Sequence, residues 1–470
     1  MAHLHDLTAI EQAEAVRRRE ISPVEIVRHY LERIERLDPQ VGAYVTVTAE
    51  RALDEARALE RGEPDGPLYG VPIPVKDLNL VKDVPIRFGS ATYEDFVAPV
   101  DDTVVERLRE AGTVMLGKTA TPEFGLPCYT ETYVSPPSRS AWDLTRSAGG
   151  SSGGAAAAVA AGLAPAAHGS DGAGSIRIPA SVCGLFGIKP TRGRISFAPI
   201  VPDLAGMSTN GPLARTVADA AALLDVMTHN TPGDLYLAPP VEGGFLEAAR
   251  REPGRLRIAR YATPVVPEAE VEPDVLAAYE EAAKTLAGLG HEIVDIAPPF
   301  TADVVPQFVT LWYTFACMHP VALDKHDRLR PLTAFLRERG HAVRAPDFLQ
   351  AQAALQLATR FALHVTNAYD AVLTPTVTQT PRPVGWFEEG GDPQETFERM
   401  KRFAAFPAIY NVTGQPAVNL PLHWTPAGLP VGVMLAGRVG EEATLISLSA
   451  QVEAARGGFW GTRRPEIWSA

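Results

Sequence analysis

Two glycine- and serine-rich segments lie in the middle of the chain, and each is joined to an apolar stretch. The first, Ala148-Gly-Gly-Ser-Ser-Gly-Gly154, continues into alanines up to Ala161, and the second, Gly169-Ser-Asp-Gly-Ala-Gly-Ser175, continues into Ile176-Arg-Ile-Pro179. Glycines allow otherwise strained dihedral angles and let main-chain N–H groups converge on one point. The apolar flanks indicate buried turns rather than flexible linkers, and the alanine run predicts a helix that its neighbours approach closely. Any fold of this chain must therefore hold two polar turns in its interior.

Predicted helices and strands alternate around these turns. Ser22, Pro23 and Glu25 are arranged as a helix start, with serine as the N-cap, and predict a helix over 23–37. Apolar residues at helical spacing predict further helices over 103–110, 217–224 and 275–286. Short apolar runs predict strands over 71–75, 113–116, 256–259 and 292–296, and a hairpin of 417–422 with 429–435. Residues 299–407 are predicted to be mainly helical and aromatic. The alternation favours a single α/β domain with a mixed sheet.

The charge and the cysteine content exclude several classes of protein. The 470 residues carry a formal net charge of -13, which argues against binding nucleic acid, because that needs clustered basic residues. Three scattered cysteines cannot form a disulfide framework, and no local metal-binding motif is present. The longest apolar run, 155–167, is shorter than the ~20 residues that cross a bilayer, and the N-terminal segment does not resemble a secretory signal. We expect a reduced, cytoplasmic protein without metal, cofactor or membrane anchor.

The converging N–H groups of the two turns suit a negatively charged group. A phosphate is one candidate, but neither turn continues into the Gly-Lys-Ser/Thr of a nucleotide-binding loop. The other candidate is the transient oxyanion of acyl transfer beside a serine nucleophile, which also explains the serines in both turns. Such a serine needs a base. His168 follows an alanine-rich segment, as core histidines do, whereas Lys76 ends an apolar strand, where loss of hydration lowers the pKa of a lysine.

Taken together, Lys76, Ser151 and Ser175 resemble the Ser-Ser-Lys triad of the amidase signature family. Lys76 stands in a Lys-Asp pair 75 positions before Ser151, and Ser151 stands 24 positions before Ser175. The resemblance is strongest over about 67–225 and returns near 411–416 and 428–432. It implies a single α/β domain over 1–470 with a central mixed sheet flanked by helices. The signature core would then comprise about 65–225 and 407–440, and a variable, substrate-shaping region about 231–406.

The resemblance implies a role for each member of the triad. Ser175 would attack the amide carbonyl and become acylated, and Ser151 would relay its proton from a cis Gly150–Ser151 peptide. Lys76, neutral at rest, would accept that proton and later supply one to the leaving amine. Amines leave poorly unless protonated, so this second step decides whether amides can be cleaved.

Supporting residues follow from the same resemblance. Gly150 would permit the cis turn, and Ser152 would hydrogen-bond nearby. Asp171 and Arg177 would form an ion pair that holds the second turn, a role equally compatible with a plain structural salt bridge. The oxyanion hole would consist of the N–H groups of Gly172, Ala173, Gly174 and Ser175.

One branch of the family is more similar than the rest. Ala173 replaces a glycine that the family usually has, and it precedes Ile178-Pro-Ala-Ser-Val-Cys-Gly184, an arrangement similar to the 6-aminohexanoate cyclic dimer hydrolases that open nylon-oligomer amides. That branch carries a cysteine that contacts the substrate, and Cys317 is the candidate equivalent, although an ordinary buried cysteine explains it as well. Trp312 and Phe315 are candidate pocket residues that could equally belong to the core.

The sequence thus favours an amidase that acts on small linear or cyclic amides, with 6-aminohexanoate oligomers or related apolar amides ranked first. Two alternatives remain within the family: the glutaminase subunit of a tRNA-dependent amidotransferase, and a general aliphatic or aryl acylamide amidohydrolase. A catalytically silent binding protein on the same scaffold is a further alternative, which the intact triad disfavours. The expected partner is a small-molecule amide, and a homo-oligomer is left open.

Overall fold

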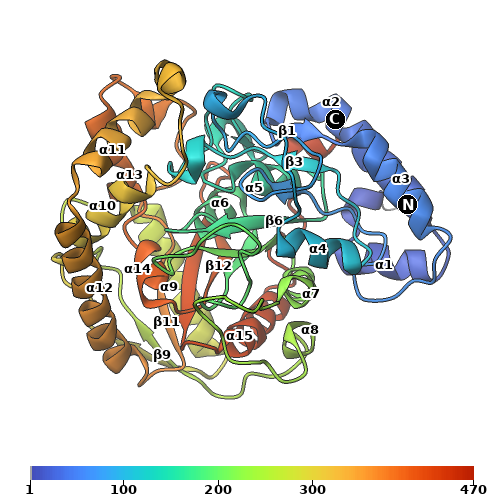
Figure 1. Cartoon of the computed structure of the whole chain (residues 1–470). Coiled ribbons are helices and arrows are strands. Elements are labelled where there is room, and N and C mark those ends of the chain that lie inside the picture. Colours follow the sequence, from blue (N-terminus) through green and yellow to red (C-terminus); the bar gives the residue numbers. More distant parts are fainter. Residues whose placement is uncertain (1–2, 470) are drawn as a thin grey trace.

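An eight-stranded mixed sheet runs through the centre of the computed structural model, which describes residues 3–469 (Figure 1). The three strands at one edge of the sheet are parallel to one another, and all other neighbouring strands in the sheet pair antiparallel. In spatial order the strands are β10 (Glu292–Asp295), β9 (Arg257–Arg260), β11 (Ala371–Pro375), β13 (Pro430–Gly437), β12 (Ala417–Trp424), β7 (Phe186–Lys189), β8 (Thr209–Ala214) and β6 (Ala166–Asp171). The two small sheets are β1 (Tyr44–Val47), β3 (Gly117–Thr119) and β2 (Val75–Lys76), and β4 (Arg139–Ser140) with β5 (Asp143–Ser147).

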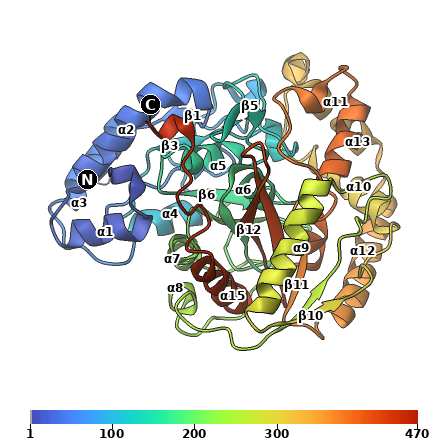
Figure 2. The same ribbon diagram turned by 180° about the vertical axis from the view of Figure 1, so that it is seen from behind.

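Helices cover both faces of the large sheet. On one face α6 (Arg177–Cys183) packs on β7, β12 and β13, beside α5 (Gly153–Ala160). On the other face lie α9 (Pro273–Gly288) and α15 (Glu442–Ala455), which Figure 2 shows in front of the strands. The domain is therefore an α/β fold with a central mixed sheet between helices, as predicted.

The remaining helices lie around these layers. Three N-terminal helices lie at one side of the molecule, and α10 to α13 stack at the opposite side (Figure 1). These helices are α1 (Ala9–Arg17), α2 (Pro23–Val41), α3 (Ala49–Leu59), α4 (Thr103–Glu110), α7 (Val217–Met227), α8 (Phe245–Ala248), α10 (Val304–Phe315), α11 (Pro331–Ala342), α12 (Ala345–Thr366), α13 (Pro393–Phe403) and α14 (Ala408–Thr413). Short 3-10 helices are Leu4–Asp6, Ala91–Tyr93, Glu123–Gly125, Leu323–Arg328, Trp386–Glu388 and Glu466–Ser469. Between residues 3 and 469, no helix combines the length and the hydropathy that a bilayer crossing requires.

Most predicted elements are confirmed, with shifts where proline intervenes. The helix after Ser22 begins with the expected capping box, α4 matches its predicted span, and β12 and β13 form the hairpin. The predicted strand 71–75 is reduced to Val75–Lys76, preceded by an isolated parallel bridge between Pro72 and Val114. Pro72 and Pro74 lack the N–H that a continuous sheet ladder needs. The strand predicted over 113–116 begins later, at Gly117, and β11 interrupts the stretch predicted to be helical.

Both polar turns lie inside the fold. The alanines of α5 are fully buried, and a side chain on Gly154 would come within 2.4 Å of the backbone nitrogen of Ala120. Only glycine permits that approach, so the helix begins directly against the neighbouring strand. The second turn connects β6, which ends at Asp171, to α6, which begins at Arg177. The fold thereby places the two turns next to each other in the interior, where the backbone N–H of Ser152 donates to the carbonyl oxygen of Ser175.

Candidate active site

Lys76 is the buried end of β2, a strand paired with β3. Its Nζ donates to the Oγ of Ser151 at 2.8 Å and to the carbonyl oxygen of Ser170 at 3.2 Å. Burial lowers the pKa of Lys76 to about 7, against a smaller raising effect from Asp171. Within residues 3–469 no carboxylate forms an ion pair with this lysine, so the amine can be neutral near neutral pH and can accept a proton from Ser151.

His168, the alternative base, is held in the core behind Lys76. Its Nδ1 lies 3.3 Å from the backbone nitrogen of Lys76, which donates to it, and its Nε2 lies 3.2 Å from Oδ1 of Asn210. Burial lowers the pKa of His168 to about 3. Both ring nitrogens are engaged, so His168 fixes the backbone of Lys76 and has no free nitrogen for a substrate.

The first turn holds Ser151 in a cis Gly150–Ser151 peptide. Gly150 must be glycine, since a side chain there would come within 2.7 Å of the backbone nitrogen of Tyr129. The carbonyl oxygen of Ser151 accepts from Oγ1 of Thr121 at 3.0 Å. Ser152 donates to the carbonyl oxygen of Ser170 at 3.0 Å and so ties the turn to β6. The same carbonyl oxygen also accepts from Nζ of Lys76.

The second turn presents Ser175 with its main-chain N–H groups. Asp171 accepts from the N–H of Gly174 at 2.6 Å and from that of Ile176 at 3.1 Å. The prediction for Gly174 is therefore corrected: its N–H is consumed by Asp171 and shapes the turn instead of facing an oxyanion. The N–H groups of Gly172, Ala173 and Ser175 have no backbone or side-chain acceptor within the described chain, which leaves them as the candidate oxyanion donors.

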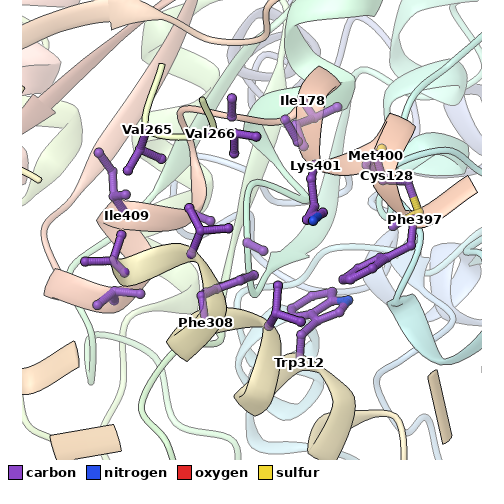
Figure 3. Close-up of a pocket in the computed structure, with 18 of the residues that line it drawn as sticks. Cys128, Ile178, Val265, Val266, Phe308, Trp312, Phe397, Met400, Lys401 and Ile409 are labelled. Atoms are coloured by element: carbon purple, nitrogen blue, oxygen red, sulfur yellow. The ribbon is translucent and has the colours of Figure 1, made fainter. Parts of the chain in front are cut away.

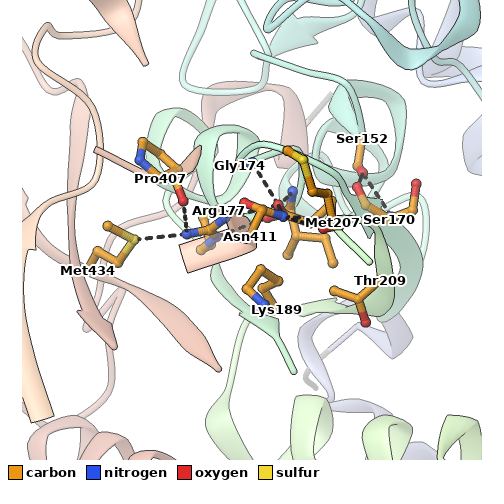
Figure 4. A network of polar contacts seen from close by, with 12 residues as sticks. Ser152, Ser170, Gly174, Arg177, Lys189, Met207, Thr209, Pro407, Asn411 and Met434 are labelled. Atoms are coloured by element: carbon orange, nitrogen blue, oxygen red, sulfur yellow. Dashed lines mark hydrogen bonds and ion pairs between the residues drawn. The ribbon is translucent and has the colours of Figure 1, made fainter. Parts of the chain in front are cut away.

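The predicted pair of Asp171 and Arg177 is present and fully buried. Figure 4 shows Arg177 in this network, beside Asn411 and Pro407. Arg177 donates through Nε and Nη2 to Asp171, each at 3.0 Å, and through Nη1 to the carbonyl oxygen of Pro407 at 2.9 Å. Burial alone would raise the pKa of Asp171, but the guanidinium of Arg177 holds it well below its usual range. The second turn is thus anchored by a charged pair whose hydrogen bonds are satisfied.

Asn411, which sequence reasoning did not single out, completes this network. Its Nδ2 donates to Oδ1 of Asp171 at 2.9 Å, and its Oδ1 accepts from Arg177 at 2.6 Å. It lies on α14, more than two hundred positions along the chain from the second turn. The only sequence signal was that residues 411–416 belong to a segment with family resemblance.

Two cavities meet at Ser175. The first, called the apolar cavity, has about 840 Å³ of empty space, counting the part open to solvent, and is lined mainly by hydrophobic side chains (Figure 3). They include Ile178, Val304, Phe308, Trp312, Phe397 and Ile409. The second, called the wide cavity, has about 1730 Å³ counted in the same way. It is lined by Ser151, Ser175 and a group of aromatic side chains that includes Phe88, Tyr93 and Phe124.

The predicted pocket residues are distributed unevenly over these cavities. Trp312 lines both of them and Phe315 lines the wide cavity. Cys317 lines neither: its Sγ points to the carbonyl oxygens of Arg337 and Tyr313, at 3.5 and 3.8 Å. The structure therefore brings Lys76 and Ser151 into contact and places Ser175, Trp312 and Phe315 around the same space, but it directs Cys317 away from that space.

The chain matches the family described as "Amidase" over residues 25–446. It is 36% identical to the 6-aminohexanoate-cyclic-dimer hydrolase of Paenarthrobacter ureafaciens, over 98% of this chain and 96% of that protein. It is 34% identical to an acylamidase of Rhodococcus erythropolis, over 98% of both chains. A solved structure of 6-aminohexanoate cyclic dimer hydrolase with substrate superimposes with a TM-score of 0.92 at 32% identity, covering 99% of this chain and 100% of that one.

Proposed function

The chain belongs to the amidase signature family and is a hydrolase of carbon–nitrogen bonds in amides other than peptide bonds, and from this premise we propose that it cleaves carboxamides through an acyl-enzyme formed on Ser175. The observation that carries the proposal is the 2.8 Å hydrogen bond between Lys76 Nζ and Ser151 Oγ, at the wall of a cavity that Ser151 shares with Ser175. A buried lysine without a carboxylate partner is an available base, and a serine beside it is a proton carrier.

The proposed reaction has two halves that use the same groups. Ser175 Oγ attacks the amide carbonyl while its proton passes to Ser151, whose own proton passes to the neutral amine of Lys76. The negative oxygen formed in this step accepts hydrogen bonds from the free N–H groups of the second turn. The proton then returns from Lys76 through Ser151 to the leaving nitrogen, and the C–N bond breaks. Water repeats the sequence on the acyl-enzyme and releases the carboxylic acid.

The two cavities assign the two halves of the substrate. The group that protonates the leaving nitrogen must lie on the amine side, and Ser151 lines the wide cavity but not the apolar one. The amine half therefore occupies the wide cavity, and the acyl half extends past Ala173 and Ile178 into the apolar cavity. The hydrophobic lining of the apolar cavity and the aromatic side chains of the wide cavity support an N-substituted amide with a hydrophobic acyl chain.

Within that class, 6-aminohexanoate oligomers or related apolar amides remain the first candidates, supported by the 36% identity to a 6-aminohexanoate-cyclic-dimer hydrolase. A general acylamide amidohydrolase is the second candidate, favoured by the size of the wide cavity, which can accept different amines. Glutamine is disfavoured as a substrate, because its charged α-amino and carboxylate groups would enter an apolar cavity whose one lysine, Lys401, is already paired with Glu398 at 2.7 Å.

A hydrolysis panel tests this proposal. Cyclic and linear 6-aminohexanoate oligomers, hexanamide, N-alkyl and N-aryl hexanamides, and glutamine are incubated with the wild type and with Ser175→Ala, and the products are measured by mass spectrometry. We expect the wild type to cleave the N-substituted hexanamides and Ser175→Ala to cleave none of them. Turnover of glutamine alone, or equal turnover by Ser175→Ala, would contradict the proposal.

A further inference from the structure

His319 brings a polar group to the wall of the wide cavity. It lies just after α10, among three aromatic side chains that line the same cavity. Its ring stacks on Phe124 with the centroids 4.8 Å apart and an interplanar angle of 13°, and Phe88 approaches the ring to 4.8 Å as well. Between residues 3 and 469 nothing hydrogen-bonds to either of its ring nitrogens. A half-buried imidazole with unused nitrogens inside a cavity is available to a ligand.

Hydrogen bonds from α11 hold the segment that carries His319 in place. Arg337, a buried residue of α11, donates to the carbonyl oxygens of Ala316 at 2.7 Å and His319 at 3.0 Å. In front, Phe88 and Phe124 adopt φ values of 50° and 53°, which bulky residues rarely adopt. The backbone N–H of Phe124 donates to the carbonyl oxygen of Phe88 at 2.7 Å. Such unusual conformations persist where the surroundings enforce them, and they are concentrated at functional sites.

The stacked rings lie on the amine side of Ser151. Gly125 follows Phe124 directly, and a side chain on Gly125 would come within 3.4 Å of the Oγ of Ser151. Ser151 therefore lies next to Gly125, and the preceding residue, Phe124, is the one on which His319 stacks. Ser151, Phe124 and His319 all line the wide cavity, so an amine half that extends from Ser151 along this aromatic wall would meet His319.

The charges around His319 select the kind of group that it can bind. Burial, with the nearby charge of Arg337, lowers the pKa of His319 to about 4, so near neutral pH the ring is uncharged and offers one donor and one acceptor. Arg337 has no carboxylate partner within the described chain, which disfavours a cation at the ring. Asp102 and Asp203 line the same cavity and disfavour an anion. An uncharged polar group satisfies both conditions.

We propose that His319 is a specificity-determining residue that hydrogen-bonds an uncharged polar group on the amine half of the substrate, such as a second amide. The proposal rests on the proposed function, because it assumes that the amine half lies in the wide cavity. It narrows the substrate class from N-substituted amides in general to those whose amine half carries a hydrogen-bonding group some distance from the scissile bond.

The test compares hexanamides that share one acyl chain and differ at the far end of the N-alkyl chain. The ends are a methyl group, an acetamide, an ammonium and a carboxylate. For the wild type we expect kcat/KM for the acetamide end to exceed that for the methyl end about tenfold, the size of one well-formed hydrogen bond, and to exceed both charged ends. His319→Phe keeps a ring that can stack on Phe124 but removes the nitrogens, so the acetamide-to-methyl ratio is expected to fall to about one.

The ratio is taken within each variant, so a general loss of activity cancels, and His319→Leu repeats the test if His319→Phe does not fold. His326→Phe, at an exposed histidine on the 3-10 helix Leu323–Arg328, serves as the matched control and is expected to keep the wild-type ratio. An unchanged ratio in both His319 variants would overturn the proposal, as would a preference for a charged end. If the wild type cleaves no member of the series, the proposed function fails and the proposal fails with it.

Discussion

The amine of Lys76 and the hydroxyl of Ser151 are 2.8 Å apart, and both groups are almost completely buried. A lysine in that position has a reduced pKa because water cannot stabilise its charge. The contact joins two segments that are 75 positions apart in the sequence, so it is made by the fold and not by local geometry.

Replacing Lys76 by methionine removes the base while keeping a side chain of similar length. We expect kcat for an N-substituted hexanamide to fall by about 10²- to 10⁴-fold, the usual contribution of general acid–base catalysis. The unfolding temperature is expected to stay the same or rise, because a buried amine costs free energy when protonated and methionine does not. Lys189→Met is the matched control, since Lys189 is equally buried and its pKa is also lowered to about 7, but it lines neither cavity. A Lys76→Met enzyme with near-normal kcat would contradict the assigned role.

The same lysine predicts how the rate depends on pH. Because burial lowers the pKa of Lys76 to about 7, the amine is protonated below that pH and cannot accept a proton. We expect kcat/KM to increase with pH up to about 7 and then to level off, in a series of buffers of constant ionic strength. Lys189→Met should keep this profile. A rate that is flat from pH 5 to 8 would show that a group other than Lys76 is the base.

Stability should respond to pH in the same range. The unfolded chain returns the pKa of Lys76 to its usual value near 10.5, so the unfolded state binds more protons between pH 7 and 10.5. The cost of burying this lysine is therefore complete below pH 7 and shrinks as the pH rises toward 10.5. In urea unfolding, the stability gained by Lys76→Met is expected to be larger at pH 6 than at pH 9. A gain that is independent of pH would mean that Lys76 titrates normally in the folded protein.

Asp171→Asn is expected to destabilise the protein severely. It leaves the fully buried guanidinium of Arg177 without a carboxylate, a change that typically costs about 3–5 kcal/mol in the free energy of unfolding. Asp347→Asn breaks an exposed ion pair with Arg344 and is expected to have no measurable effect. Both are measured by urea unfolding at pH 7. Equal midpoints for the two variants would show that the buried pair does not anchor the second turn.

The apolar cavity predicts a preference for long acyl chains. Hexanamide has four more methylene groups to bury than acetamide, and at about 0.8 kcal/mol each this favours its kcat/KM by about 200-fold. Val309→Trp fills part of the cavity from α10 and is expected to reduce the ratio to near one. Leu349→Trp, at an exposed position of α12, should leave the ratio unchanged. A ratio that survives Val309→Trp would place the acyl chain elsewhere.

The two turns and several of the helices could be predicted because their signals are local. Glycine and serine runs, the cap at Ser22 and the hairpin turn at Thr425-Pro-Ala-Gly428 depend on neighbouring residues only. The strand before Lys76 was misplaced for a local reason too, since its prolines remove the N–H groups that pairing requires. β11 was missed because it is a short apolar run inside a helical stretch, where periodicity does not separate the two structures.

The site residues that were missed depend on contacts between distant segments. Asn411 and His319 carry no motif of their own. Their positions become informative only when α14 packs against the second turn and the segment after α10 packs against Phe124. For Gly174 the sequence predicted the turn correctly but not the partner of its N–H, because that partner depends on where the Asp171 carboxylate lies. Cys317 was compared with a cysteine of related enzymes, yet packing against α11 turns its thiol away from both cavities.

The acyl-enzyme itself gives the most direct test of the central claim. The wild type and Ser175→Ala are mixed with N-hexanoyl p-nitroanilide, quenched in acid within milliseconds to seconds, digested and mapped by mass spectrometry. The mechanism predicts a hexanoyl group on the peptide that contains Ser175, present during turnover by the wild type and absent from Ser175→Ala. A hexanoyl group on another residue, or turnover by Ser175→Ala at the wild-type rate, would contradict it.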